Sequence, residues 1–557
     1  MPERTDDARP WWQEGVIYQI YPRSFADSNG DGVGDLRGIV SRLDYLKELG
    51  VDGIWLSPIH PSPMFDFGYD VSDYRGIAPE FGTLDDFRLL LREAHARGIR
   101  ILLDLVLNHS SHLHPWFVES RSSRTSDKRD WYIWADGKNG GPPNNWLAAF
   151  GGSAWEWDEA TQQYYLHSFL PQQPDLNWRN PRVKQAAEDI IAYWLDMGVD
   201  GFRLDVVNWF LKDDQLRDNP VKLLGRRPYD RQKHIYDRNR PETIDLMRWL
   251  RAVVDRWPER MTVGEVYNEP PGNPELSASY YAGGEGLHLA FDFSLLFCSW
   301  SAAEMGRAID TWESALPPPC WPTWTLGNHD QRRVLSRYAS ASNRAARGRV
   351  AATLVLTLRG TPFLYYGEEI GMLDVKIPRS RLQDPLGKAY WPLPVGRDPA
   401  RTPMQWSGEP HAGFSTVEPW LPVHPEFAEI NVARAESDPG SLLHWYRNLI
   451  RLRREEPVLR RGTLRRLAQG SSVLGYVREH EGERVAVLLN FESKPRQAAL
   501  PTGATWRVLM ASARRPGDRI VGGPLELDAD GVLIAKAGPP QARTLGSERG
   551  ARSAAAR

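Results

Sequence analysis

Short apolar segments rich in β-branched residues alternate with longer segments of helical spacing from the start of the chain to residue 370. Predicted strands cover residues 16–21, 52–58, 101–108, 199–207, 261–266, 287–293, 324–328 and 361–366. Strands that alternate with helices form a parallel sheet, and eight of them predict an α/β fold, a (β/α)₈ TIM barrel. The alternative, an open doubly wound sheet, carries a Gly-x-Gly-x-x-Gly turn after a strand, and none is found here.

Start and stop signals bound the predicted helices. Thr83 is placed to cap one helix, and Gly98 supplies a left-handed stop for it. Asn180 followed by Pro181 repeats the start signal, and Gly198 repeats the stop. Each stop is followed directly by a predicted strand, as the barrel interpretation requires.

Two long segments interrupt the alternation of strands and helices, and the pattern changes again toward the end of the chain. A loop-rich insertion comes after strand 3, and the chain after residue 463 reads as short alternating runs at 473–477, 484–490, 506–510 and 532–535, typical of a C-terminal antiparallel β-domain. A closing helix is predicted at 440–456. The predicted organisation is a catalytic barrel at 1–109 and 177–462, an inserted domain at 110–176, an inserted segment at 371–431, a β-domain at 463–545 and a disordered tail at 546–557.

Composition removes several classes of function. The 557 residues hold 69 Lys and Arg against 71 Asp and Glu, a net charge of −2, which argues against a nucleic-acid-binding face. Two cysteines exclude a disulfide scaffold. The first residues lack the apolar core of a secretory signal, and the longest apolar stretch, near 351–358, is too short to span a bilayer. We therefore expect a cytoplasmic monomer or homodimer with no nucleic-acid or membrane partner.

Polar side chains stand at the ends of four predicted strands. They are Asp104 and His109 on the third strand, Arg203 and Asp205 on the fourth, Glu265 on the fifth, and His329 and Asp330 on the seventh. A lone Asp at a strand end is usually a cap or turn residue. The carboxyl ends of barrel strands meet at one face, however, so these side chains would share one pocket. Like charges gathered so closely indicate a function.

This set of side chains predicts glycoside hydrolysis, which needs one carboxylate to attack the anomeric carbon and one protonated carboxyl to release the leaving oxygen. Arg203 precedes Asp205 by two residues, so both point to the same side, and the arginine charge would keep Asp205 ionised as a nucleophile. Glu265 has no basic neighbour in the sequence, so partial desolvation would raise its pKa, which suits a general acid.

The four strand ends resemble the four signature regions of the α-amylase family of glycoside hydrolases. Further motifs resemble its oligo-1,6-glucosidase and α-glucosidase subfamily: Asp66-Phe-Gly-Tyr69-Asp70, Gln173-Pro-Asp-Leu-Asn177, Tyr366-Gly-Glu-Glu369-Ile-Gly-Met372 and Arg401-Thr-Pro-Met-Gln-Trp406. The likeness covers roughly residues 11–540.

The resemblance implies Asp205 as nucleophile, Glu265 as acid/base and Asp330 as transition-state stabiliser. It also implies a substrate-binding set made of Asp66, Tyr69, His109, Arg203, His329, Arg397 and Arg401. Arg397 would pair with Asp66 against the non-reducing end of the substrate. That closure would make the enzyme exo-acting, releasing one glucose at a time.

A separate loop places oxygen ligands at alternate positions with glycines between them. Its candidate ligands are Asp27, Asn29, Asp31, Val33 and Asp35. The spacing resembles a calcium loop, although the glutamate at the twelfth position of an EF-hand is absent. The related glucosidases bind Ca²⁺ or Mg²⁺ here, which implies a structural ion and no organic cofactor. The alternative is that these residues form an ordinary turn rich in Asp, Asn and Gly that binds no metal ion.

The predicted function is a retaining exo-α-glucosidase on short α-glucosides of isomaltose type, with maltose or sucrose as further substrates. The alternative is a glucosyl transferase or a trehalose- or sucrose-rearranging isomerase, because these share all three carboxylates. Val206 follows the nucleophile directly. In the resembling glucosidases, Val at this position tends to accompany cleavage of α-1,6 bonds, and Thr or Ala tends to accompany α-1,4 preference.

Overall fold

The computed structural model describes residues 9–267 and 273–538 and contains an eight-stranded parallel barrel. Its strands are β1 (Ile17–Ile20), β2 (Gly53–Leu56), β3 (Arg100–Leu105), β7 (Gly201–Leu204), β8 (Met261–Glu265), β9 (Leu289–Phe291), β10 (Thr323–Trp324) and β11 (Thr361–Tyr365). Hydrogen bonds join them in the order β10-β11-β1-β2-β3-β7-β8-β9. The hydroxyl of Thr323 on β10 donates to the carbonyl of Ala290 on β9 over 2.8 Å, which links the two ends of this order. The predicted fold class is confirmed.

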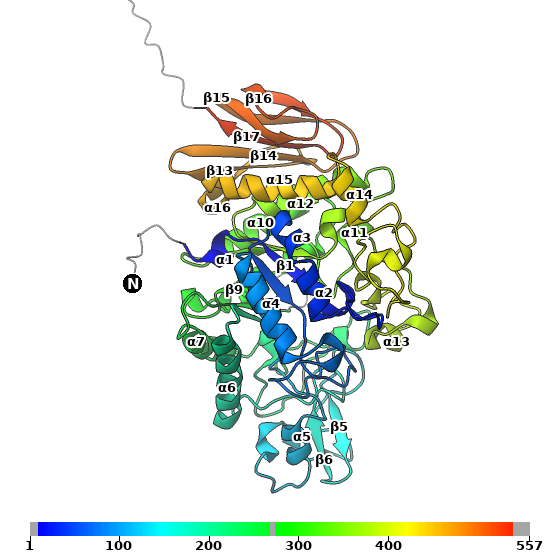
Figure 1. Cartoon of the computed structure of the whole chain (residues 1–557). Helices are drawn as coiled ribbons and strands as arrows, with labels where there is room; N and C mark the ends of the chain where they lie inside the picture. Colours follow the sequence, from blue (N-terminus) through cyan, green and yellow to red (C-terminus); the bar gives the residue numbers. More distant parts are fainter. Residues whose placement is uncertain (1–8, 268–272, 539–557) are drawn as a thin grey trace, which may run out of the picture.

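Helices cover the outside of the barrel (Figure 1). They include α2 (Leu36–Ser41), α3 (Leu43–Leu49), α4 (Leu84–Ala96), α6 (Pro181–Met197), α7 (Thr243–Val254), α8 (Pro274–Ser279), α10 (Ala302–Ala315), α11 (Val334–Tyr338) and α12 (Arg344–Thr357). Thr83 caps α4 in a capping box with Asp86. Asn180 caps α6, and Gly198 ends it in the left-handed region at φ 108°. Both predicted pairs of signals are confirmed.

Most of the barrel strands are shorter than the sequence indicates, and the fourth and the seventh are examples. The fourth ends at Leu204 because Val206 adopts a left-handed backbone with φ 35°, and a 3-10 turn over Val207–Trp209 follows. The seventh ends at Trp324, and the Thr325 hydroxyl then donates to the Gly327 carbonyl over 2.7 Å. In both places the chain leaves the sheet early, because its polar residues turn toward the carboxyl-end face.

The two long insertions have little regular structure. Residues 110–176 hold α5 (Pro115–Ser120) and a small antiparallel sheet of β4 (Trp134–Ala135), β6 (Gln163–Leu166) and β5 (Trp155–Asp158). Residues 371–431 hold one short helix, α13 (Pro385–Ala389), among 3-10 turns. β5 and β6 lie at the end of the molecule opposite to the C-terminal sheet in Figure 1.

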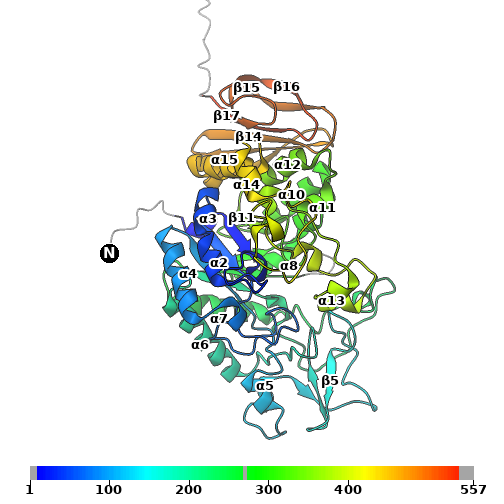
Figure 2. The same cartoon turned by 45° about the vertical axis from the view of Figure 1, so that its right-hand side comes forward.

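The C-terminal region is an antiparallel sheet, as predicted, with six strands where the sequence pattern indicated four. It contains β12 (Thr463–Leu467), β13 (Val473–His480), β14 (Glu483–Asn490), β15 (Arg496–Ala511), β16 (Arg519–Leu527) and β17 (Val532–Ala537), hydrogen-bonded in the order β12-β13-β14-β17-β15-β16. Before it come α14 (Val432–Ser437), the closing helix α15 (Leu442–Glu455) and α16 (Pro457–Arg461). Figures 1 and 2 both show α15 between this sheet and the barrel.

Two buried arginines join the C-terminal region to the last barrel strand. Arg453 on α15 donates to the carbonyls of Leu356 (3.1 Å) and Gly360 (2.7 Å). Arg478 on β13 donates to the carbonyl of Thr357 over 2.6 Å. The carbonyls of Leu356 and Thr357 lie at the end of α12, and Gly360 directly precedes β11. Burial lowers the pKa of Arg453 to about 10 and that of Arg478 to about 9.

Among the described residues, none of the helices has both the length and the apolar character needed to span a bilayer. The segments 1–8, 268–272 and 539–557 lie outside the described residues, and the predicted disordered tail at 546–557 falls within the last of them.

Candidate active site

A cavity of about 740 Å³ opens at the carboxyl ends of the barrel strands. Asp205 follows β7, Glu265 ends β8 and Asp330 follows β10, so three strands deliver the three carboxyls. The insertion after β3 contributes Phe150 and Phe169 to the wall. The site is therefore assembled from barrel ends and long loops, as the sequence predicts.

Arg203 on β7 lies at the centre of the carboxyl cluster. Its Nη1 atom is 2.7 Å from Oδ1 of Asp104 and 2.8 Å from Oδ1 of Asp205, and its Nη2 atom contacts Oε2 of Glu265. Arg203 stands opposite Val263 in the sheet register, and Glu265 is two residues further along on the same face of β8. Glu265 has no basic neighbour in the sequence, but the fold places Arg203 beside it.

One guanidinium shared among three carboxyls does not lower all of their pKa values. Burial raises the pKa of Asp205 well above its usual range, and Arg203 opposes that rise without cancelling it. Burial also raises the pKa of Glu265, and it raises the pKa of Asp104 to about 6. The expectation that Arg203 keeps the pKa of Asp205 low is therefore not met. The cluster of three carboxyls therefore retains a proton, because three carboxylate anions would outnumber the single Arg203 cation.

An ion pair forms another part of the cavity wall. Nη2 of Arg397 lies 2.5 Å from Oδ1 of Asp66 and 2.6 Å from Oδ1 of Asp384, and its Nη1 atom lies 3.5 Å from Oδ1 of Asp330. Although burial acts to raise the pKa of Asp330, the basic groups around it, including His329, Arg397 and Arg401, hold that pKa below its usual range. Asp330 is thus an anion facing the cavity.

Tyr69 and His109 complete the polar wall. The Tyr69 hydroxyl is hydrogen-bonded to Nε2 of His329 over 2.5 Å and donates to Oδ2 of Asp104 over 3.2 Å. Nε2 of His109 lies 2.9 Å from the Tyr69 carbonyl oxygen. Burial lowers the pKa of His109 to about 4, so its imidazole is neutral at pH 7.

Seven of the ten predicted catalytic and substrate-binding residues line the cavity: Asp66, Tyr69, His109, Asp205, Glu265, Asp330 and Arg397. Arg203, His329 and Arg401 are buried and are not among the lining residues. Arg401, for example, donates to Asp330 over 2.8 Å and to the His329 carbonyl over 2.8 Å. These three side chains contact the residues that form the cavity wall.

Sequence reasoning gave no role to two buried aspartates. Asp104 is the penultimate residue of β3 and contacts Arg203; the sequence placed it at a strand end without giving it a role. Asp384 binds Arg397 from within the second insertion, where no periodic pattern marks it. The aromatic wall of Phe150, Phe169 and Trp209 was also unassigned.

The predicted metal loop follows β1. The Asp27 carboxylate accepts hydrogen bonds from the amides of Gly30 (2.7 Å) and Gly32 (2.8 Å), and Oδ1 of Asp31 accepts one from the Val33 amide (2.8 Å). The carboxylate of Asp35 caps α2. Within residues 9–267 and 273–538 no group of three or more His, Cys, Asp or Glu side chains is arranged to hold a metal ion. Asp27, Asp31 and Asp35 are therefore not gathered as a ligand group in this structure, and the other two candidate ligands are the amide oxygen of Asn29 and the backbone carbonyl of Val33.

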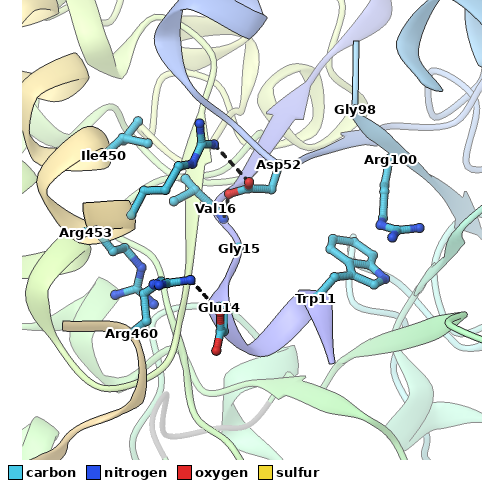
Figure 3. Close-up of a pocket in the computed structure, with 11 residues that line it drawn as sticks. Trp11, Glu14, Gly15, Val16, Asp52, Gly98, Arg100, Ile450, Arg453 and Arg460 are labelled. Atoms are coloured by element: carbon cyan, nitrogen blue, oxygen red, sulfur yellow. Dashed lines mark hydrogen bonds and ion pairs between the residues drawn. The ribbon is translucent and has the colours of Figure 1, made fainter. Parts of the chain in front are cut away.

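A second cavity of about 280 Å³ lies at the opposite end of the barrel, where β1, β2 and β3 begin (Figure 3). Its carboxylates are already paired with arginines. Nη1 of Arg460 lies 2.7 Å from Oε2 of Glu14, and Nη2 of Arg454 lies 3.0 Å from Oδ1 of Asp52. Paired charges at the amino ends of barrel strands stabilise the barrel and carry no chemistry.

Comparisons with known proteins agree with this geometry. Residues 19–462 match the family model described as alpha amylase, catalytic domain. The chain is 45% identical to a probable alpha-glucosidase of Rhizobium meliloti, covering 88% of this chain and 91% of that one. It is 41% identical to an oligo-1,6-glucosidase of Parageobacillus thermoglucosidasius, covering 88% and 92%.

Solved structures show the same fold at similar identity. The crystal structure of an alpha-glucosyl transfer enzyme superposes with a TM-score of 0.91 at 42% identity, covering 95% of this chain and all of that one. A trehalulose synthase of Pseudomonas mesoacidophila superposes with a TM-score of 0.88 at 36% identity, with the same coverage.

Proposed function

This chain belongs to the alpha-amylase family of glycoside hydrolases, and we propose that it is a retaining, exo-acting α-glucosidase that releases glucose from the non-reducing end of short α-glucosides. The observation that carries the proposal is the pairing of Arg397 with Asp66, 2.5 Å apart, in the wall of the same cavity that Asp205 and Glu265 line. A glucosyl unit seated at the carboxyls would end against this pair, so a longer chain could extend only toward the opening.

The shared cation supports a retaining reaction. Asp205 and Glu265 both contact Arg203, which brings them close together. Retaining glycosidases hold their two carboxyls about 5–5.5 Å apart, whereas inverting enzymes leave about 6.5–9.5 Å for a water molecule.

In the first step the Asp205 carboxylate oxygen attacks the anomeric carbon while the bond from that carbon to the leaving oxygen breaks. Glu265 gives its proton to the leaving oxygen, and a glucosyl ester forms on Asp205. In the second step the Glu265 carboxylate takes a proton from water, the water oxygen attacks the anomeric carbon, and Asp205 leaves as a carboxylate. Asp330, held as an anion by the surrounding basic groups, stabilises the positive charge that develops on the sugar ring.

Linkage preference rests on Val206, which lines the cavity directly after the nucleophile. We propose isomaltose-type α-1,6 substrates, with maltose or sucrose besides. One branched side chain changes the path open to the second sugar, since the two linkages send that sugar in different directions.

A panel of isomaltose, maltose, sucrose and trehalose, followed by NMR from the first turnover, tests the function. We expect α-glucose as the first product from isomaltose. Release of β-glucose would exclude retention, and hydrolysis of internal bonds in a long chain would exclude exo action.

The alternative is transfer of the glucosyl group to a second sugar, because the two superposed structures are an alpha-glucosyl transfer enzyme and a trehalulose synthase. In that reaction a sugar hydroxyl replaces water in the second step. Accumulation of trehalulose or another rearranged disaccharide from sucrose, in place of free glucose, would support it.

We also propose that the loop of Asp27, Asn29, Asp31, Val33 and Asp35 holds a structural Ca²⁺ or Mg²⁺. All the atoms it offers are oxygens, the ligands that such hard cations take. When bound, the ion would neutralise the loop's carboxylates and supply no chemistry to the reaction. The cytoplasmic location and the monomeric or homodimeric state stay predictions, which cell fractionation and light scattering measure.

A further inference from the structure

Two buried aspartates close the base of one loop in the second insertion. The Asp398 carboxylate accepts hydrogen bonds from the amides of Gln383 (2.7 Å) and Asp384 (3.0 Å). The Asp384 carboxylate in turn accepts hydrogen bonds from the amides of Gly387 (3.1 Å) and Arg397 (2.8 Å). Both side chains are fully buried. We call residues 384–397, held by these two aspartates, the clasped loop.

The clasped loop forms part of the cavity wall. Leu386, Leu393 and Val395 line the cavity from it. Its last residue, Arg397, carries the guanidinium that meets Asp66. The loop therefore supplies both an apolar rim and a charged part of the cavity wall.

Asp384 binds the same guanidinium from the side away from the cavity. Nε of Arg397 lies 2.9 Å from Oδ1 of Asp384, and Nη2 lies 2.6 Å from the same atom. Asp384 does not line the cavity, whereas Asp66 and Asp330, the other two carboxylates facing this guanidinium, both do. A sugar in the cavity can thus reach Asp66 and Asp330 but not Asp384.

We propose that Asp384 is a positioning residue for glucose binding, which acts only by holding the Arg397 guanidinium in the wall of the cavity. The inference rests on the proposed function and deepens it, because it assigns the origin of the exo-acting closure. Without Asp384 the guanidinium would be drawn between Asp66 and Asp330, into the space where sugar hydroxyls bind.

The electrostatics of the pair agree with this role. Burial acts to raise the pKa of Asp384, but the guanidinium groups of Arg397 and Arg401 outweigh it and hold that pKa below its usual range. Asp384 is therefore an anion at neutral pH, and its carboxylate pairs with the Arg397 guanidinium.

A double-mutant cycle tests the proposal, with Asp384→Asn made in the wild type and in an Arg397→Ala background. The readouts are the dissociation constant of glucose by calorimetry and KM for an aryl α-glucoside. In the wild type we expect Asp384→Asn to weaken glucose binding about 10- to 100-fold, the usual range for losing hydrogen bonds to a charged group. In the Arg397→Ala background we expect almost no further change.

The matched control is Asp398→Asn, which loosens the other half of the clasp without touching the guanidinium. Its effect on glucose binding should be the same in both backgrounds. If Asp384→Asn also weakens binding equally in both backgrounds, Asp384 only supports the loop, and the proposal is overturned. If the wild type binds glucose but hydrolyses no α-glucoside, the proposed function fails while the cycle still decides the role of Asp384.

A stability measurement covers the case in which Asp384→Asn alone does not fold. Arg397→Ala leaves the Asp384 carboxylate buried without its cation. Adding Asp384→Asn to Arg397→Ala removes that charge and should raise Tm. A further fall in Tm would contradict the pairing that the proposal requires.

Discussion

The reacting residues share one cation, and this fact shapes what substitutions should do. Replacing Asp205 by Asn keeps the shape of the site and removes the nucleophile, so kcat should fall by about three orders of magnitude or more. Steady-state rates on an aryl α-glucoside measure the loss. Asp214→Asn, at an exposed position of the same segment, is the control and should leave kcat unchanged. A kcat for Asp205→Asn within tenfold of the wild type would remove Asp205 from the nucleophile's role.

The loss of rate on replacing Glu265 should increase with the need of the leaving group for a proton. Glu265→Gln should slow hydrolysis of alkyl glucosides far more than hydrolysis of glucosides with acidic phenol leaving groups. The measurement is kcat/KM across a series of leaving groups of different pKa. An equal loss on every member of the series would show that Glu265 is not the acid.

Val206 is held in an unusual backbone conformation, since a β-branched residue at φ 35° is strained. Thr has the same branching, so Val206→Thr leaves this strain in place and changes only the group that faces the second sugar. The ratio of kcat/KM on isomaltose to that on maltose should move toward maltose, by a factor within the 10–200-fold that a methyl-scale change allows. An unmoved ratio would show that another part of the cavity selects the linkage.

At the scale of elements, the sequence pattern predicted the repeated strands of the barrel and missed two irregular strands of the C-terminal sheet. Alternating apolar segments located all eight barrel strands, because burial on both faces leaves a continuous apolar run. β12 was missed because Arg465 and Arg466 interrupt its pattern, and β16 was missed because Gly522, Gly523 and Pro524 are typical of a turn.

Contacts between distant loops were beyond the sequence pattern. The motif residues Asp66 and Arg397 could be named because they resemble a known family. Asp384 could not, since its partner lies 13 residues away in an irregular loop and no periodicity brings them together. The sharing of Arg203 between Asp205 and Glu265 likewise depends on the register of β7 against β8, which the sequence does not state.

The loop after β1 should stabilise the fold through a bound ion. The double variant Asp27→Ala, Asp31→Ala loses Tm even without metal, because Asp27 also accepts hydrogen bonds from loop amides. The informative quantity is therefore the difference in Tm between Ca²⁺ and a chelator. We expect a higher Tm with Ca²⁺ for the wild type and no difference for the double variant.

Asp73→Ala is the matched control for this measurement, since Asp73 also accepts a hydrogen bond from the amide two residues on, at an exposed turn. It should keep the Tm difference of the wild type. A wild-type Tm that is the same in Ca²⁺ and in chelator would remove the case for the ion.

At the scale of the whole molecule, Glu368 should make stability depend on pH. Burial and the neighbouring charge of Glu369 raise the pKa of Glu368 to about 8, against about 4.3 in the unfolded chain. Between these values the folded protein keeps a proton that the unfolded chain has released, so the free energy of unfolding falls as pH rises. Glu368→Gln removes this dependence.

The Tm of Glu368→Gln relative to the wild type should therefore increase from pH 5 to pH 8 and level off above about pH 9. Scanning calorimetry across this range measures it. Glu455→Gln, on an exposed part of α15, should show a constant offset. A constant offset for Glu368→Gln as well would mean that Glu368 is ionised in the folded protein.

Arg453 and Arg478 restrict how recombination between genes could separate the barrel from the C-terminal sheet. The carbonyl groups that lead into β11 receive their donors from α15 and from the C-terminal sheet. A gene fragment that ended before the sheet would keep Arg453 but lose Arg478, and the buried carbonyl of Thr357 would lose this donor. The sheet is thus not a module that a lineage can gain or shed freely. Exchange among related genes should carry the barrel and the sheet together, and fusion partners should be tolerated at the ends of the chain rather than at the boundary between the two.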